Sequence, residues 1–158
     1  MKKLLAVLAV LFVMGTTSVF ALGIGAQGGA RVGRDTVGNG ALTFKLDDKP
    51  FVFAVDGSFR SNYIGVGLTA DMWLANPSIS GPFGYYYGWG LAGSVGIGGD
   101  YLGFDIGARL LGGLNCKLLD GFIELYLQAA WQPTLAILPG IGFDLFSFPV
   151  NGGIRFWF

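Results

Sequence analysis

Apolar and polar residues alternate along most of the chain after residue 21, down to the final "NGGIRFWF". There Ile154, Phe156 and Phe158 share one parity and Arg155 has the other. An alternation with a period of two predicts β-strands, because successive side chains of a strand point to opposite faces. Stretches rich in glycine, proline, aspartate and asparagine separate eight such segments and predict turns. The segments span residues 22–33, 41–47, 51–60, 63–74, 84–97, 101–114, 121–132 and 148–158.

Two connections carry particular expectations. A turn is expected within 115–119, after the sixth strand, and a two-residue loop there would place Arg109 opposite Glu124 across an antiparallel pair. The segment 132–148 fits no single element, although "FDLFSF" is a candidate for lengthening the last strand. No repeat longer than a hairpin is found.

The two faces of the expected strands differ in chemistry. One face is bulky, aromatic and free of charge, whereas the other is rich in glycine and small polar residues. The second face also holds every charge within the strands, four of each sign, which suits an ion-paired filling better than a catalytic carboxylate pair. These charged residues are Arg31, Lys45, Asp56, Asp71, Asp105, Arg109, Glu124 and Arg155.

This division of the faces favours a barrel that turns its apolar side outward. Eight strands enclose a space that side chains just fill, so large residues would crowd it while glycine leaves room for long charged side chains. A soluble barrel would need the opposite arrangement, and a membrane barrel shows its apolar face to lipid. The sequence therefore predicts an all-β fold, an eight-stranded antiparallel up-and-down transmembrane β-barrel spanning residues 22–158.

Aromatic positions support the same architecture. Outward aromatic residues fall near both ends of the expected strands, as in the interfacial girdles of membrane barrels. Inward aromatic residues gather at the end where the chain terminates, and we expect them to form a floor across the barrel. The expected floor consists of Trp73, Tyr86, Phe122 and Trp157.

The first 21 residues have the composition of a secretory signal peptide. "MKK" is basic, "LLAVLAVLFVM" is apolar and "SVFA" ends in small residues, which predicts cleavage after Ala21. The apolar run is shorter than the ~20 residues that a membrane-spanning helix needs. We therefore expect an exported protein.

The remaining composition narrows the function. Ten basic residues balance ten acidic ones, so no nucleic-acid surface is expected. The chain has no histidine and one cysteine, Cys116, which removes the commonest general base and any internal disulfide. "GIGAQG" matches a dinucleotide-binding spacing but lacks the preceding strand and following helix. No catalytic, cofactor-binding or metal-binding residue is assigned, and we expect a protein that is not an enzyme.

The sequence resembles the small eight-stranded bacterial outer-membrane barrels of the OmpA transmembrane-domain, OmpX and OmpW class. More narrowly it resembles an uncharacterised family of small spirochaetal-type barrels, through "ALTFKLDDKP", "ADMWLANPSISG", "GYYYGWGLAG", "LLDGFIELYLQAAWQP" and "FPVNGGIRFWF". The resemblance implies outer-membrane lipid and the barrel-assembly machinery as partners. It also implies that the last strand is the assembly signal, through Gly153, Ile154, Phe156 and Phe158.

Two functions remain open at this point. The first is a structural or surface-interaction role for a barrel with a salt-bridged, largely closed interior, whose external ligand or host protein is unknown. The second is a narrow pore, or a barrel that transports or binds a small apolar molecule, because the inward glycines could leave a lumen. Conductance in planar bilayers separates the two.

Overall fold

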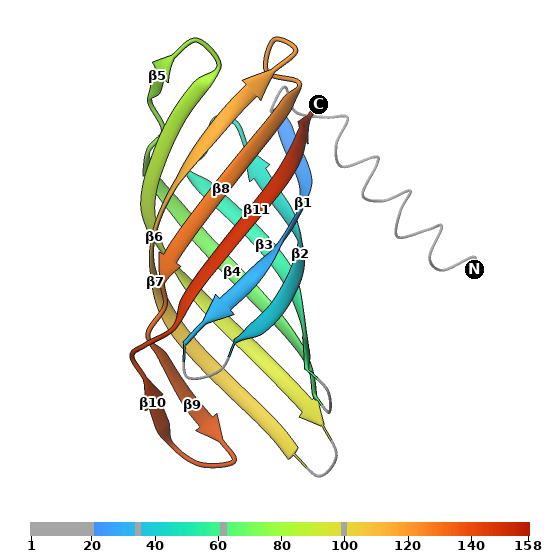
Figure 1. Cartoon of the computed structure of the whole chain (residues 1–158), viewed down its shortest axis with the longest axis vertical. Coiled ribbons are helices and arrows are strands. Elements are labelled where there is room, and N and C mark those ends of the chain that lie inside the picture. Colours follow the sequence, from blue (N-terminus) through green and yellow to red (C-terminus); the bar gives the residue numbers. More distant parts are fainter. Residues whose placement is uncertain (1–20, 34–35, 61–62, 99–100) are drawn as a thin grey trace, which may run out of the picture.

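The structure, a computed structural model, describes residues 21–158 apart from 34–35, 61–62 and 99–100. The expected signal peptide, 1–21, lies almost entirely outside the described residues. The described chain is built from strands (Figure 1). They are β1 (Leu22–Val32), β2 (Val37–Leu46), β3 (Phe51–Arg60), β4 (Tyr63–Ala75), β5 (Ser78–Ser80), β6 (Phe83–Gly98), β7 (Tyr101–Leu118), β8 (Ile123–Trp131), β9 (Thr134–Leu138), β10 (Gly142–Asp144) and β11 (Phe148–Trp157).

Eight of these strands close into an antiparallel barrel. Neighbours in the chain pair in the order β1, β2, β3, β4, β6, β7, β8 and β11, and β11 pairs back with β1 from Val32 to Gly23. The closure reaches the last residue, because Leu22 and Phe158 each donate a backbone hydrogen bond to the other, at 3.0 and 3.1 Å. The expected all-β, eight-stranded antiparallel barrel is therefore confirmed.

The two ends of the barrel differ in their connections and in how far the strands extend. Both Leu22 and Phe158 lie at one end, which we call the terminal end, together with the short turns 47–50, 76–82 and 119–122. At the opposite, distal end, β6 and β7 run past their neighbours, and the β9–β10 hairpin stands beside them (Figure 1). Strands β1 to β3 have 10 or 11 residues, whereas β6 has 16 and β7 has 18.

The expected turn within 115–119 is wrong. Strand β7 continues to Leu118, and the chain reverses over Leu119, Asp120 and Gly121, which have φ values of 52°, 54° and 93°. Positive φ angles are accessible to glycine and to aspartate, and "DG" is the strongest turn signal in this stretch. Neither Cys116 nor Lys117 brings such freedom, so the strand alternation continues through them.

The segment 132–148 contains the β9–β10 hairpin. Strand β9 keeps the register of β8 on β7, since Leu110 faces Trp131 and Gly107 faces Thr134. Pro133 has no N–H to donate to the ladder, which explains the break between the two strands. Strand β10 pairs only with β9 within the described part of the chain. The last strand begins at Phe148, the final residue of "FDLFSF", so that stretch does not lengthen it.

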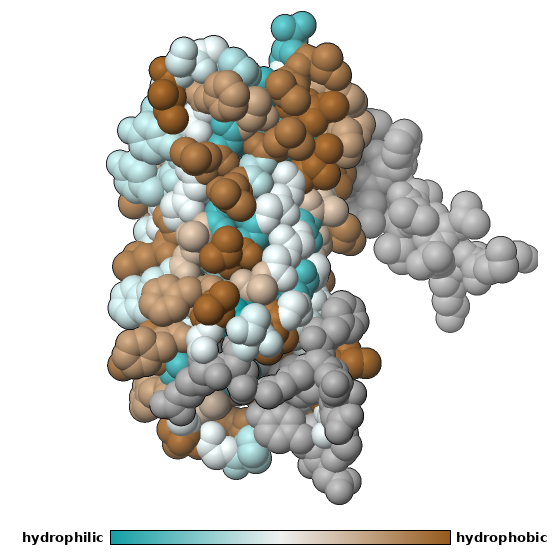
Figure 2. Space-filling model, viewed as in Figure 1, coloured by the Kyte–Doolittle hydropathy of each residue, from teal (hydrophilic) through white to brown (hydrophobic). Residues whose placement is uncertain are grey.

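The outward face is apolar and the inward face is polar. Outward side chains such as Leu68 and Ile97 are 61% and 62% exposed, and apolar residues are spread over the visible face in Figure 2. Inward side chains such as Glu124 and Arg155 are buried. Across the described residues, no helix has the length and apolar character needed to cross a bilayer.

Two tyrosines fill the inside of the barrel by lying over glycines of neighbouring strands. The ring of Tyr86 occupies the place that a side chain at Gly113 would take, and the ring of Tyr126 does the same at Gly153. Gly113 stands opposite Tyr86, and Gly153 stands opposite Tyr126, so each glycine is the direct cross-strand partner of its tyrosine. The inward glycines thus provide volume for aromatic rings.

Adding one methyl group to these glycines should destabilise the barrel. We expect Gly113→Ala and Gly153→Ala each to lower the free energy of unfolding by about 1–3 kcal/mol, the usual cost of overpacking. The outward neighbours are matched controls, because a Cβ at Gly112 or Gly152 would lie 3.6 or 3.8 Å from its nearest atom. Urea titration of protein refolded in detergent measures the difference. Equal losses in Gly113→Ala and Gly112→Ala would contradict the packing described here.

Candidate functional site

The eight charged residues expected inside the barrel all lie on its inward face, in two groups. The terminal half contains five that are at most 6% exposed, and the distal half contains three that are half-buried. The buried group is Lys45, Asp71, Arg109, Glu124 and Arg155, and the half-buried group is Arg31, Asp56 and Asp105. Both signs occur in both groups, so neither half concentrates one charge.

Glu124 on β8 is the centre of the terminal half. Its side chain is fully buried and accepts a hydrogen bond from Arg155 Nη1 at 2.6 Å, on the adjacent strand β11. Asn115 Nδ2 donates to its other oxygen at 2.8 Å, and Trp157 Nε1 donates at 3.2 Å. Arg155 and Glu124 face each other directly in the β8–β11 register. Three donors from two neighbouring strands therefore replace the water that the carboxylate loses on burial.

The second buried ion pair spans three strands. Arg109 Nε on β7 lies 3.0 Å from Asp71 Oδ1 on β4, and both side chains are 5% exposed. Gly90 on β6 stands between them, since it faces Asp71 on one side and Arg109 on the other. A Cβ at Gly90 would collide with the Asp71 carboxylate, so the missing side chain is what lets the pair meet. Arg109 Nη1 also donates to Gln132 Oε1 at 2.9 Å.

The expected pairing of Arg109 with Glu124 is wrong. It assumed a turn at Cys116 and Lys117, whereas the real turn lies further along the chain and shifts the register of β7 on β8. Glu124 then faces Lys117, and Arg109 lies beside Gln132 instead. Each of the two expected partners keeps an oppositely charged neighbour, but from another strand.

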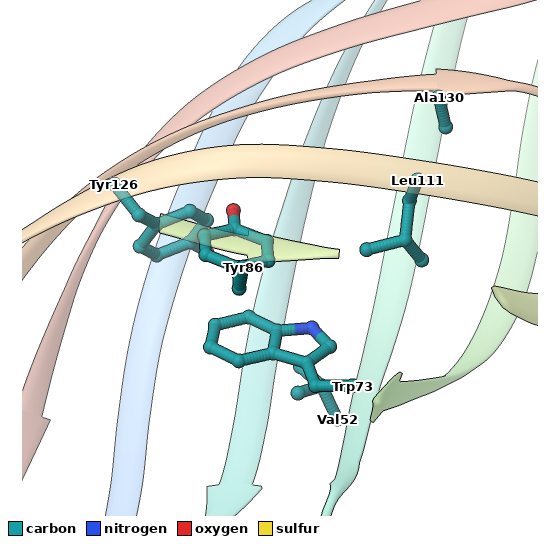
Figure 3. Close-up of a cluster of buried hydrophobic side chains, with 6 residues drawn as sticks. All are labelled: Val52, Trp73, Tyr86, Leu111, Tyr126 and Ala130. Atoms are coloured by element: carbon teal, nitrogen blue, oxygen red, sulfur yellow. The ribbon is translucent and has the colours of Figure 1, made fainter. Parts of the chain in front are cut away.

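Aromatic rings complete the filling of the terminal half. Trp73 and Tyr86 stack with ring centres 3.7 Å apart and planes 9° apart (Figure 3). The guanidinium carbon of Arg155 lies 4.6 Å from the ring centre of Tyr126. Lys45 Nζ lies 5.2 Å from the ring centres of both Trp73 and Trp157. Cations placed over aromatic faces are stabilised there, most strongly when they are desolvated.

The expected floor is therefore only partly the observed one. Phe122 does not enter the barrel: it is 45% exposed, and its ring packs against Phe156 and Phe158 on the outside. Phe122 belongs to the turn with positive φ angles, where strand alternation no longer sets the direction of a side chain. Tyr126 was missed, although its parity matches that of Glu124 and already indicated an inward ring.

The distal half of the interior is more open. Gln27 accepts a hydrogen bond from the Tyr126 hydroxyl at 3.0 Å, at the boundary between the halves. Beyond it, Ser94 Oγ lies 3.5 Å from Asp105 Oδ2, and the acidic side chains there stay partly exposed. Among the residues that the structure describes, no three histidine, cysteine or acidic side chains come together as metal ligands. The interior is thus closed toward the terminal end and accessible toward the distal end.

The four residues of the expected assembly signal lie on β11 and at its end. Gly153 is covered by Tyr126, while Ile154 and Phe156 are partly exposed on the outward side. Phe158 is 73% exposed, and its backbone pairs with Leu22. All four therefore lie at the closing seam of the barrel, where the last strand pairs with the first.

Comparison with solved structures finds a similar barrel. The crystal structure of Neisserial surface protein A (NspA) superimposes with a TM-score of 0.56 and 16% sequence identity, over 89% of this chain and 98% of that one. No family model and no curated protein matches the sequence. The chain has the fold of a small outer-membrane barrel.

Exchanging the charges of the observed pair, Glu124 and Arg155, should be tolerated better than exchanging those of the wrongly expected pair, Arg109 and Glu124. We expect Glu124→Ala to lower the free energy of unfolding by about 3–5 kcal/mol, because it leaves Arg155 buried without its carboxylate. Asp105→Ala is the control and should cost about 0–1 kcal/mol, since its surroundings are partly exposed. The double exchange Glu124→Arg with Arg155→Glu should recover part of the loss, and Glu124→Arg with Arg109→Glu should recover none. Denaturant titration in micelles tests this, and recovery by the second exchange would refute the observed pairing.

Proposed function

We propose that the chain is an integral outer-membrane barrel protein with a structural or surface-interaction role and a largely closed interior. The observation that carries this proposal is the buried layer of ion pairs and stacked rings across the terminal half. The outward face supports membrane insertion, because a closed sheet with apolar side chains outside satisfies its backbone groups without water. NspA, whose name describes a surface protein, supports the same setting through its fold alone.

Export and assembly are part of the proposal. A signal peptide cleaved after Ala21 would deliver the chain to the periplasm, and the barrel-assembly machinery would insert it into outer-membrane lipid. Interaction with an external ligand or host protein would then use the distal end, where β6, β7 and the β9–β10 hairpin project. No catalytic role is proposed, because Asp71 and Glu124, the two buried carboxylates, are each paired with an arginine.

A narrow pore is the alternative, and the packing of the terminal half speaks against it. Trp73, Tyr86 and Glu124 are at most 4% exposed, so the path through this half is filled by side chains. Under this proposal the partly open distal interior is a cavity with one entrance, because the aromatic layer closes its inner end. The two functions predict different conductance.

Wild-type protein in planar bilayers should show conductance near zero. We expect Tyr86→Ala, combined with Trp73→Ala, to open steady channels, because these two rings form the stacked centre of the filled layer. Tyr87→Ala combined with Tyr85→Ala is the matched control, since both rings point outward and are 50% and 42% exposed. Steady channels in the wild type would overturn the closed interior and favour the transport alternative.

The terminal phenylalanine should matter for assembly more than for stability. Phe158→Asp keeps the backbone bonds to Leu22 but removes the apolar side chain at the terminus. We expect a marked fall of folded protein in the outer membrane of cells, with unchanged refolding in micelles. Leu119→Asp, at a turn residue of the same end that is 71% exposed, serves as the control. Normal outer-membrane levels of Phe158→Asp would remove the assembly role.

A further inference from the structure

An apolar groove lies on the outer wall of the barrel, beneath the β9–β10 hairpin. It has a volume of about 570 Å³, within the ~300–1,000 Å³ range of small-molecule sites. Its walls come from β6, β7, β9, β10 and the residues next to β9 and β10 in the chain. The apolar side chains that define it are Leu91, Ile106, Ala108, Leu135, Phe143 and Leu145.

The groove lies beside a strand, β10, that pairs with β9 and with none of the eight barrel strands among the described residues. Strand β9 continues the ladder on β7, but β10 turns back along β9 while the chain returns to the barrel only at β11. Trp131 Nε1 donates to the Leu145 carbonyl at 2.8 Å, and this hydrogen bond joins the end of β8 to the residue that follows β10. Phe143, on β10, is 69% exposed and lines the groove.

The lining selects a ligand without polar groups. No charged side chain lines the groove, and its only side-chain hydroxyl, on Thr134, already donates to the Gln132 carbonyl at 3.0 Å. A polypeptide would bring N–H and C=O groups for which these side chains offer no free partner, and burying such groups unpaired is costly. An alkyl chain has no such groups.

The position of the groove indicates where that alkyl chain comes from. Leu91 and Ala108 face each other on the outward surface. Trp89 and Leu110, two residues away on each strand, form the next outward pair. If the proposed membrane setting holds, this surface is in contact with lipid, and the groove opens onto it. We infer that the groove holds one acyl chain of a bilayer lipid, clamped between the hairpin and the wall. This inference rests on the proposed function.

Lipid retention tests the inference. Protein reconstituted in phosphatidylcholine bilayers is exchanged into detergent, and native mass spectrometry then counts the phosphatidylcholine that stays bound. The wild type should retain a lipid that Phe143→Asp loses. Phe146→Asp is the matched control and should keep it, because Phe146 is 66% exposed on the same connection but does not line the groove. Ala108→Trp should also lose the lipid by filling the groove, whereas Leu68→Trp, outward on β4, should keep it.

The outcomes separate the groove from the membrane proposal. Equal retention in Phe143→Asp and Phe146→Asp, or no retained lipid in the wild type, overturns the acyl-chain site while the barrel still inserts. Dimers of the wild type that Phe143→Asp dissociates also overturn it, since the occupant would then be a second copy of the chain. Failure of the wild type to enter bilayers at all, read from its unheated gel mobility after reconstitution, would instead overturn the proposed function.

Discussion

The pairing of the first strand with the last is the constraint on which the rest of the structure depends. Once β1 and β11 join from Val32 to Gly23, every strand of the barrel has a partner on both sides over its central part. A closed sheet has an inside and an outside. Successive side chains of a strand therefore point alternately into the lumen and away from the barrel. Eight strands also fix how little room the inside offers.

That small interior explains why glycine and large polar side chains occur together. Three long inward groups use space that a glycine on a neighbouring strand leaves free: Tyr86 over Gly113, Tyr126 over Gly153, and the Asp71–Arg109 pair across Gly90. The charges of the terminal half are buried away from bulk water, and four of them form two ion pairs. The buried layer of the terminal half therefore depends on all of its members, and the same side chains fill the space between the strands there.

The sequence was sufficient to predict the fold and the face of each strand residue, because both depend on parity, and parity survives errors of one or two residues in strand ends. The sequence did not predict which inward charged residues form ion pairs. Pairing depends on register, and a turn placed at Cys116 instead of Leu119 to Gly121 moved Glu124 away from Lys117 in the expected ladder. The Arg155–Glu124 pair needed the register of β8 on β11, which the uninterpreted segment 132–148 concealed. The inward direction predicted for Phe122 was wrong for a related reason, since side chains do not alternate between two faces inside a turn.

The distal end shows what the closure leaves undetermined. Strands of ~9–11 residues are long enough to cross a bilayer, and β1 to β3 have that length, whereas β6 and β7 exceed it by several residues. The added length is not needed to enclose the two buried ion pairs described above, which lie nearer the terminal end. It carries instead an outward face that stays apolar up to Ile97 and Leu102, and it supports the β9–β10 hairpin. The distal strands and the hairpin are separate from the buried layer, and under the proposed function they are the part that meets another molecule, at the outer wall and not through the lumen.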